Sequence, residues 1–310
     1  MSRFVGGFVA LLIAATTAHA ALARTLEVGA DKPYKLLSDA NAHASSGDRI
    51  VISPGEYFDC AVVKANDLVI EGAGKAEDVV LTDKACEGKA ALVIRGGNVT
   101  IHNLTLTRER VPDGNGAGIR AEGVNLTVDH VRFVNNQEGI LAAAAPESTI
   151  IVRDSAFLQN GACNPSCAHG IYVGPLKLLH VEHSRFFETR QAHHIKSRAA
   201  RTEVIDCDLQ DGPNGTSSYQ IELPNGGALV ARGNVIEKGP LSENQGTVIS
   251  IGAEGVTQRT SEITIENNTL RIDGPYKTVF VRNLTATEAR LVGNKLPSAA
   301  KPLVGDGSVR

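Results

Sequence analysis

Short runs of alternating apolar and polar residues recur along most of this chain. Each run ends in a polar corner and one bulky apolar residue. The clearest runs are residues 99–106, 126–133, 150–157, 179–186, 202–209, 229–236, 263–270 and 289–296. Strict alternation predicts strands with one buried face. The closing apolar residues recur about every 25 residues, which indicates a repeat architecture.

A second series of short apolar segments lies between these runs, and each segment centres on an isoleucine. The isoleucines are Ile119, Ile140, Ile171, Ile195, Ile221 and Ile249. At least two strands per repeat, without helical periodicity, predict a parallel solenoid whose coils stack on a shared apolar column. The Leu-x-x-Leu-x-Leu pattern of leucine-rich repeats is absent. The hairpin turns that a β-sandwich needs every 8–12 residues or so are also absent.

The segment 47–57 reads Gly-Asp-Arg-Ile-Val-Ile-Ser-Pro-Gly-Glu-Tyr. It resembles the start of the first coil in right-handed parallel β-helix proteins of the pectate-lyase-like superfamily. The resemblance implies an all-β, single-domain parallel β-helix over residues 25–298. It also implies a short N-terminal capping helix at residues 37–45 and a C-terminal tail over residues 299–310. This fold carries lyases, hydrolases, esterases, epimerases and non-catalytic fibres, so it implies no single activity.

The N-terminus has the features of a secretory signal. Arg3 precedes a short apolar run over residues 4–15, and Ala18-His19-Ala20 has the small-x-small form of a cleavage site. We therefore expect a signal peptide over residues 1–20, with cleavage after Ala20 or after Ala23. The run is shorter than the ~20 residues that span a bilayer. The mature protein is thus expected to be secreted or periplasmic, without integral membrane association.

The chain has five cysteines, an odd number, so disulfides in an oxidising compartment would leave one of them unpaired. Cys163 and Cys167 are close enough to close one loop with a disulfide. Cys60 and Cys86 are a second candidate pair, and Cys207 is left over in a strand-like run, where we expect it to be buried. A zinc site is disfavoured because Cys163-x3-Cys167 lacks a second thiolate pair at zinc spacing.

Composition and charge argue against nucleic-acid binding and favour a folded protein rich in strands. The 310 residues carry 31 Lys+Arg against 34 Asp+Glu, a formal net charge of -3. This balance lacks the excess of positive charge that nucleic-acid-binding proteins typically carry. The 42% hydrophobic content supports a folded core, and 31 glycines with no tryptophan favour strands and turns. We expect a monomer.

The candidate chemistry follows from the register of the coils. If the isoleucines face inward, the residues after them face outward and stack about 4.8 Å apart. That column reads Arg120, Leu141, Tyr172, Lys196, Glu222 and Ser250. The residues before the isoleucines are also expected to face outward, and they include His194 and Gln220. Arg198 and Arg201 follow Lys196, and His169 and His193 are expected at strand edges beside the patch. The alternative is structural, with Lys196 and Glu222 forming only a cross-strand ion pair.

This set matches the needs of a β-eliminating lyase. A cation must neutralise a uronate carboxylate, a base must remove the C5 proton, and an acid must protonate the leaving oxygen. Arg198 or Arg201 suits the first role, Lys196 or His194 the second, and Tyr172 the third. We expect Glu222 to orient Lys196 and neighbouring cations to lower the pKa of Lys196. Tight pairing with Glu222 would instead keep Lys196 protonated. His169, His193, Arg201, Gln220 and Arg120 are candidate substrate contacts.

The sequence therefore predicts a polysaccharide lyase acting on an acidic, uronate-containing polysaccharide. The first alternative is a non-catalytic β-helix that binds glycan or forms an envelope or fibre module. A glycoside hydrolase is another alternative, because the segment 168–174 (Ala-His-Gly-Ile-Tyr-Val-Gly) and His194-Ile195-Lys196 resemble the Gly-His-Gly and Arg-Ile-Lys motifs of polygalacturonase-type enzymes. The acid pair of those enzymes is missing at residues 136–139 and 160–163. A C5-epimerase would use the same groups as a lyase. No cofactor is expected, and any metal at the site is expected to be Ca²⁺, bound by carboxylates and carbonyls.

Overall fold

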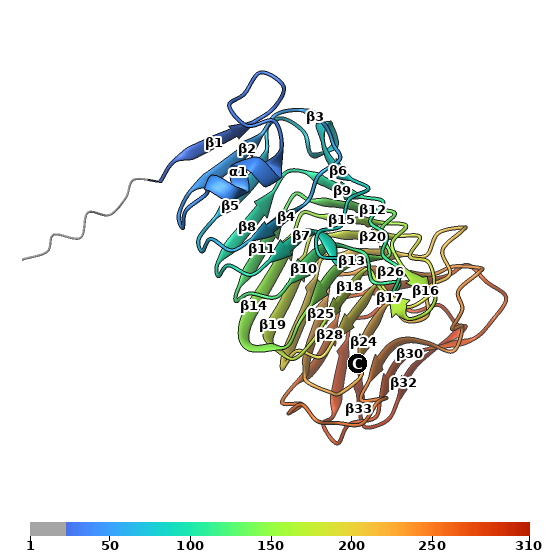
Figure 1. Ribbon diagram of the computed structural model, residues 1–310. Coiled ribbons are helices and arrows are strands. Elements are labelled where there is room, and N and C mark those ends of the chain that lie inside the picture. Colours follow the sequence, from blue (N-terminus) through green and yellow to red (C-terminus); the bar gives the residue numbers. More distant parts are fainter. Residues whose placement is uncertain (1–22) are drawn as a thin grey trace, which may run out of the picture.

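The computed structural model describes residues 23–310, so the predicted signal peptide lies outside the described residues. The chain winds into an elongated parallel β-solenoid, with strands stacked along one axis from the N-terminal to the C-terminal end (Figure 1). Successive coils add strands to three long sheets, which we call the first, second and third sheets. In this described part, no helix is long and apolar enough to cross a bilayer.

The three sheets contain 12, 10 and 9 strands. The first comprises β1 (Thr25–Val28), β2 (Arg49–Ile52), β5 (Val69–Gly72), β8 (Val99–His102), β11 (Leu126–Asp129), β14 (Ala145–Arg153), β19 (Leu176–Glu182), β22 (Arg201–Ile205), β25 (Ala228–Arg232), β28 (Ile263–Glu266), β31 (Ala289–Val292) and β33 (Gly307–Val309). The second comprises β4 (Ala61–Val63), β7 (Ala90–Ile94), β10 (Ala117–Ala121), β13 (Glu138–Ala142), β18 (Ile171–Val173), β21 (Ile195–Ser197), β24 (Ile221–Leu223), β27 (Thr247–Ile251), β30 (Thr278–Asn283) and β32 (Ala300–Val304). The third comprises β3 (Gly55–Tyr57), β6 (Val79–Thr82), β9 (Thr105–Thr107), β12 (Arg132–Val134), β15 (Ala156–Leu158), β20 (Arg185–Phe187), β23 (Asp208–Gln210), β26 (Val235–Lys238) and β29 (Thr269–Ile272).

The predicted isoleucine column is confirmed in the second sheet. Each isoleucine is the direct cross-strand partner of the next, from Ile119 through Ile140, Ile171, Ile195 and Ile221 to Ile249. All six side chains are fully buried. Burying a side chain of this size stabilises the fold by roughly 1.5–3 kcal/mol, so the column favours this register over any shifted one.

Aromatic rings in the third sheet pack against glycines in the second. Phe133, Phe157 and Phe186 stack with ring centroids 4.6 and 4.5 Å apart. A Cβ atom at Gly139 would lie 2.8 Å from the Phe157 ring, and one at Gly118 would lie 2.6 Å from the Phe133 ring. A larger residue at either position would collide with a ring, so these glycines make room for the phenylalanine stack.

The corners between the first and third sheets use left-handed backbone. Asn103, His130, Asp154 and His183 occupy equivalent corners with φ between 47° and 55°, a conformation that Asn, Asp and His tolerate better than most residues. In the C-terminal coils, the residue directly after each of these corner positions is an asparagine, and these asparagines form a ladder. Asn234 Nδ2 donates to Asn268 (2.8 Å), and Asn268 Nδ2 donates to Asn294 (2.9 Å). The polar residues at the corners of the sequence repeat therefore shape the turns and hydrogen-bond neighbouring coils to one another.

The two ends of the solenoid differ in how well the sequence predicted them. Helix α1 (Leu37–His43) buries Leu37 and Ala40 in the main core beside β1, β2 and β4. Its role in closing the open end stays a prediction. The C-terminal boundary expected at residue 298 is wrong, because β32 and β33 extend the second and first sheets almost to the last residue. The segment 299–310 joins these ladders instead of forming a tail.

The cysteines pair as Cys60–Cys86 and Cys163–Cys167. The second pair closes the hairpin of β16 (Ala162–Cys163) and β17 (Cys167–Ala168), which are antiparallel. Cys207 is free and buried. Burial raises the pKa of its thiol to about 12, so this thiol stays protonated and unreactive. A short 3-10 helix, η1 (Ala76–Asp78), completes the elements.

The isoleucine column gives the first testable prediction. Ile195→Asp buries an unpaired charge in the middle of the column and is expected to prevent folding, whereas Ile195→Val should cost only about 0.5–1.5 kcal/mol. Circular dichroism and thermal melting of the two variants test this. A folded Ile195→Asp protein with a near-normal melting temperature would contradict the assigned register.

A second prediction concerns a buried acid, Glu109, in the loop after β9. Its carboxyl oxygens have no hydrogen-bond partner among the described residues, and burial raises its pKa to about 8. The folded protein then binds this proton more tightly than the unfolded chain, so stability is lost as the pH rises from about 5 towards 8. We expect Glu109→Gln to match the wild type near pH 4 and to be more stable near pH 8, by a margin on the order of a few kcal/mol.

Denaturant unfolding at the two pH values measures this difference, with exposed Glu147→Gln as the matched control. Equal pH dependence in the wild type and Glu109→Gln would show that Glu109 does not carry a buried proton.

Candidate functional site

A column of outward side chains crosses the middle of the second sheet. Tyr172 pairs in register with Lys196, and Lys196 with Glu222. Arg120 and Leu141 precede Tyr172 on the same column, and Ser250 follows Glu222. We call these six residues the outer column. Its order agrees with the sequence prediction because the buried isoleucines set the alternation of every strand.

Opposite charges surround Lys196. Its Nζ lies 2.8 Å from Glu254 Oε1 and 3.2 Å from Glu222 Oε2. Arg198 NH2 donates to the other oxygen of Glu254 at 2.6 Å, and Arg198 Nε donates to the Tyr172 hydroxyl at 2.9 Å. Asn225 accepts a further bond from Arg198. One compact cluster thus holds a phenol, an ammonium, a guanidinium and two carboxylates.

The protonation state of Lys196 differs from the prediction. Burial lowers its pKa, but the hydrogen bond to Glu254 and the charge of Glu222 outweigh burial, and the pKa lies above its usual value. The expected lowering by neighbouring cations is therefore wrong, because the nearest groups are carboxylates. Burial raises the pKa of Glu222, but His193 and Lys196 outweigh it and the pKa is lowered. Lys196 and Glu222 are both charged near neutral pH.

Two histidines line the edge of this cluster, and each has a fixed hydrogen-bond pattern. His169 Nδ1 accepts the backbone N–H of His193, and His193 Nδ1 accepts the backbone N–H of Tyr219, both at 3.2 Å. A neutral ring that accepts at Nδ1 carries its proton on Nε2. His193 Nε2 lies 3.0 Å from Glu222. Burial, with the neighbouring His193 and Lys196, holds the pKa of His169 well below its usual value. His169 therefore stays neutral near pH 7, and its Nδ1 lone pair is already used by the His193 N–H.

His194 and Gln220 do not face outward, which corrects the sequence prediction. Both are fully buried. His194 Nδ1 is 2.6 Å from Thr189 Oγ1, and His194 Nε2 is 3.1 Å from Asp211. Gln220 Nε2 donates to the same Asp211 at 3.1 Å. The strand β21 begins only at Ile195, so the strict alternation that predicted an outward His194 does not reach the corner before it.

The inward position of His194 has a packing reason. Equivalent positions in the preceding coils are glycines that make room for phenylalanine rings. The coil after His194 carries Leu209 in place of phenylalanine, and His194 fills the space against the edge of Phe186. Burial raises the pKa of Asp211, but His194 and Lys238 outweigh burial and bring it to about 2. The Asp211 carboxylate and its hydrogen-bond partners His194 and Gln220 are thus part of the buried interior.

Arg201 also lies away from the outer column. It is in β22 of the first sheet, where it contacts Glu203 at 2.6 Å and Glu262 at 2.9 Å. Five residues after Lys196 the chain has already entered β22 of the first sheet, so proximity in sequence does not bring Arg201 to the site. Arg120 stays on the outer column, but Leu141 separates it from Tyr172.

Two acids at the site were missed by the sequence reasoning. Glu138 precedes Ile140 by two residues, as His169 precedes Ile171, and this shared offset was the available signal. Its carboxyl is fully buried without a hydrogen-bond partner in the described residues, and burial raises its pKa well above the usual value. No sequence pattern marked Glu254, because it lies outside the strand repeat. It reaches Lys196 from the loop after β27, where Gly252 and Gly255 adopt positive φ.

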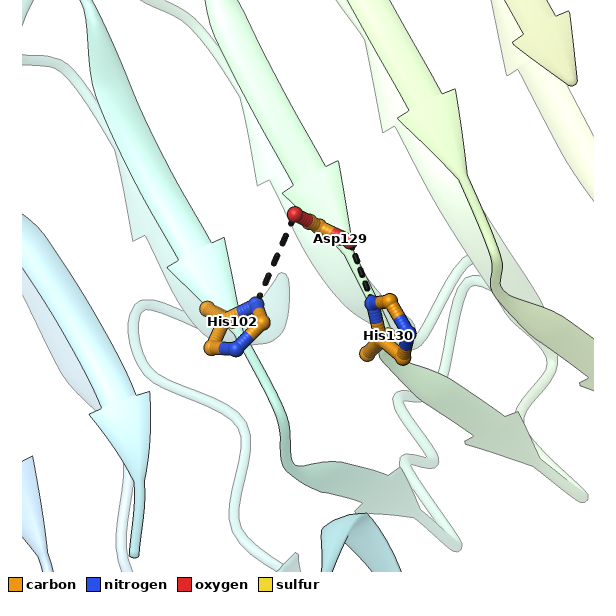
Figure 2. A group of neighbouring side chains, drawn as sticks. All are labelled: His102, Asp129 and His130. Carbon is orange, nitrogen blue, oxygen red and sulfur yellow. Dashed lines mark hydrogen bonds and ion pairs between the residues drawn. The ribbon is translucent and has the colours of Figure 1, made fainter.

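The best-placed metal-ligand side chains in the described residues lie elsewhere, on the first sheet. Figure 2 shows His102 and His130 on either side of Asp129. His102 Nδ1 is 3.6 Å and His130 Nδ1 2.5 Å from the Asp129 carboxylate. Arg153 also binds this carboxylate, at 2.9 Å. A cation would compete with that guanidinium, and two imidazoles do not suit Ca²⁺. The group behaves as a surface ion-pair chain.

Neither a protein-family model nor a curated protein matches this chain. Its structure is similar to that of an alginate lyase from Paenibacillus sp. str. FPU-7, with a TM-score of 0.62, 18% identity and coverage of 92% of this chain and 99% of that one. It is also similar to the pectin methylesterase from Aspergillus niger, with a TM-score of 0.56, 11% identity and coverage of 92% and 91%. Such low identities support the fold but no shared activity. The chain is a right-handed parallel β-helix protein, as its repeat and its segment 47–57 predicted.

Proposed function

We propose that this protein is a polysaccharide lyase that cleaves an acidic, uronate-containing polysaccharide by β-elimination. The fold is shared with enzymes named for alginate and pectin, which are both polyuronates. That likeness supports an acidic sugar polymer as the substrate class. The proposal rests mainly on the cluster around Lys196.

The position of Glu254 is the observation that carries the proposal. Its carboxylate binds Lys196 with one oxygen and Arg198 with the other, at 2.8 and 2.6 Å. Glu254 belongs to a loop, and its side chain is 43% exposed. A uronate carboxylate has the same charge and geometry, and can replace Glu254 between the two cations. Bound there, its sugar ring would lie beside Tyr172.

The proton transfers follow from the charges of the cluster. Arg198 neutralises the uronate carboxylate and so makes the C5 proton acidic. The tyrosinate form of Tyr172, whose oxygen accepts a hydrogen bond from Arg198, takes this proton as the base and becomes the neutral phenol. The C4–O4 bond breaks, a C4=C5 double bond forms, and Lys196 gives its proton to the leaving O4. This assignment exchanges the roles expected for Tyr172 and Lys196, because Lys196 has a raised pKa and a proton to donate.

The two carboxylates of the cluster fit a hydrolase less well. A glycoside hydrolase needs one protonated and one ionised carboxyl on either side of the bond. Glu222 and Glu254 both pair with cations that lower their pKa after burial has raised it. Neither therefore holds a proton to donate near neutral pH, and Glu138, whose pKa burial raises, has no exposed surface through which to reach a substrate.

The compartment and assembly predictions are part of this proposal. Two disulfides suit an oxidising space, which supports secretion or a periplasmic location. We propose a monomer that needs no metal, because the cations required for charge neutralisation are already present as Arg198 and Lys196.

The third prediction tests the activity. Purified protein incubated with alginate or polygalacturonate should produce unsaturated uronates, which are detected by their ultraviolet absorbance. Lys196→Ala and Tyr172→Phe should each lower turnover by about 10²- to 10⁴-fold, the usual effect of removing a positioned acid or base. Lys177→Ala, on the exposed face of β19, is the matched control and should retain full activity.

The outcomes separate the candidate functions. Reducing ends without ultraviolet absorbance would indicate a hydrolase. Polymer binding without any product would indicate a glycan-binding module. Full activity of Lys196→Ala would show that the cluster is not catalytic, even with the fold intact.

The fourth prediction separates the two roles of Lys196. Glu254→Gln removes the carboxylate that competes with the substrate and that raises the pKa of Lys196. We expect KM for the polymer to fall several-fold. If Lys196 donates the proton, activity is lost as the pH rises through its pKa, so the alkaline limb of the pH–rate profile should move to lower pH. A shift of the acidic limb instead would identify Lys196 as the base.

A further inference from the structure

A shallow cleft runs along the solenoid axis at the corner between the third and second sheets. Its volume is about 550 Å³. We call it the arginine cleft, and its lining residues are Arg110, Gln137, Gly161, Ala162, Arg190, Gln191, Asn214 and Thr216. They come from the loops that follow β9, β12, β15, β20 and β23, which are neighbours in the third sheet. Four steps of about 4.8 Å make the cleft roughly 19 Å long, enough for several sugar rings.

Two guanidinium groups meet in the cleft without a carboxylate between them. Arg110 NH2 and Arg190 NH1 both donate to Asn135 Oδ1, at 2.9 Å each. Arg110 NH1 donates to the Asn135 backbone carbonyl at 2.7 Å. Across residues 23–310, neither arginine forms an ion pair with an acid. Burial and the nearby charge of Arg190 lower the pKa of Arg110 and outweigh the opposite effects of Glu109 and Asp83.

The acids near these arginines are engaged elsewhere. The Glu188 oxygens accept hydrogen bonds from the amides of Gln159 and Asn214, at 2.8 Å each. Asp83 binds Arg108. Glu109 carries a proton near neutral pH because its pKa is about 8. Glu188 remains a carboxylate near Arg190, so two guanidinium groups face one nearby negative charge and the cleft keeps a net positive charge.

The other polar groups of the cleft add donors. Gln137 Oε1 accepts the backbone N–H groups of Val111 and Gly116 at 2.8 Å, which leaves its amide N–H₂ available. Thr216 Oγ1 accepts the Gln191 N–H at 2.8 Å and keeps its hydroxyl proton. A surface rich in donors and positive charge is complementary to an anion with many oxygen atoms.

We propose that the arginine cleft is a second binding site for a carboxylate-bearing sugar chain, separate from the cluster around Lys196. The β16–β17 hairpin stands between the two sites, since Ala162 of β16 borders the cleft and β17 leads directly into His169. The choice of a uronate chain rests on the proposed function, but the binding requires no catalysis. The site holds the polymer near the Lys196 cluster and raises its local concentration there.

Asn135→Asp is the sharpest test of this site. It places a carboxylate at the shared acceptor of the two arginines and offsets one of their two positive charges without removing either side chain. Asp also tolerates the positive φ of 54° at this position. The second variant is Arg110→Ala/Arg190→Ala. The control, Lys177→Ala/Arg290→Ala, removes the same charge from the outer face of the first sheet.

Affinity electrophoresis in gels containing alginate, polygalacturonate or neutral dextran measures binding, and thermal melting confirms folding. Wild type and Lys196→Ala are both used as backgrounds, so that turnover does not hide binding. We expect Asn135→Asp and the double arginine variant each to weaken binding to the two polyuronates by about tenfold at low salt, the equivalent of one charge-assisted contact. High salt should shrink the difference. Initial rates on short oligouronates should not change.

These binding measurements test the arginine cleft independently of whether the protein is a lyase. Weakened polyuronate binding in both variants supports the cleft even if no cleavage is ever observed. Unchanged binding by a folded Asn135→Asp protein overturns it and assigns the arginines a purely structural role. Loss of binding in the first-sheet control to the same extent would also overturn it, because the effect would then be one of net charge.

Discussion

The structure depends on the in-register stacking of identical positions from coil to coil. Parallel backbone hydrogen bonds hold neighbouring strands together, and the buried isoleucine column selects one register from those that backbone pairing alone would allow. Every other column inherits this register. The outer column, the phenylalanine stack and the asparagine ladder are all consequences of it. A shift in one strand would move its whole set of side chains to the opposite face.

Stacking also explains why charges accumulate in the middle of the second sheet. Positions about 4.8 Å apart bring Tyr172, Lys196 and Glu222 into contact range without any special loop. An ammonium flanked by two carboxylates keeps its proton, and a guanidinium that shares one of those carboxylates extends the positive surface. Lys196 and Arg198 together hold one carboxylate, that of Glu254, which is the position assigned to the uronate in the proposed function.

The same geometry builds surfaces at the corners. Loops that follow neighbouring strands also lie above one another, so side chains such as Arg110 and Arg190 meet although they are 80 residues apart. A solenoid can therefore present extended grooves on more than one face. Grooves of this kind suit linear polymers, because the coil spacing repeats along the direction in which the chain extends.

The sequence alone determined the solenoid, the isoleucine column and the order of the outer column, because strand periodicity and coil length are local and repeated. It also indicated the cysteine pairs and placed Cys207 in the interior. It failed at the corners and at the chain end. His194 and Gln220 precede strands, where alternation no longer holds, and β32 and β33 carry the ladders past the expected boundary. Glu254 and the arginine pair could not be found from periodicity. Their positions depend on how irregular loops fold back over the coils, and only the tertiary structure decides that.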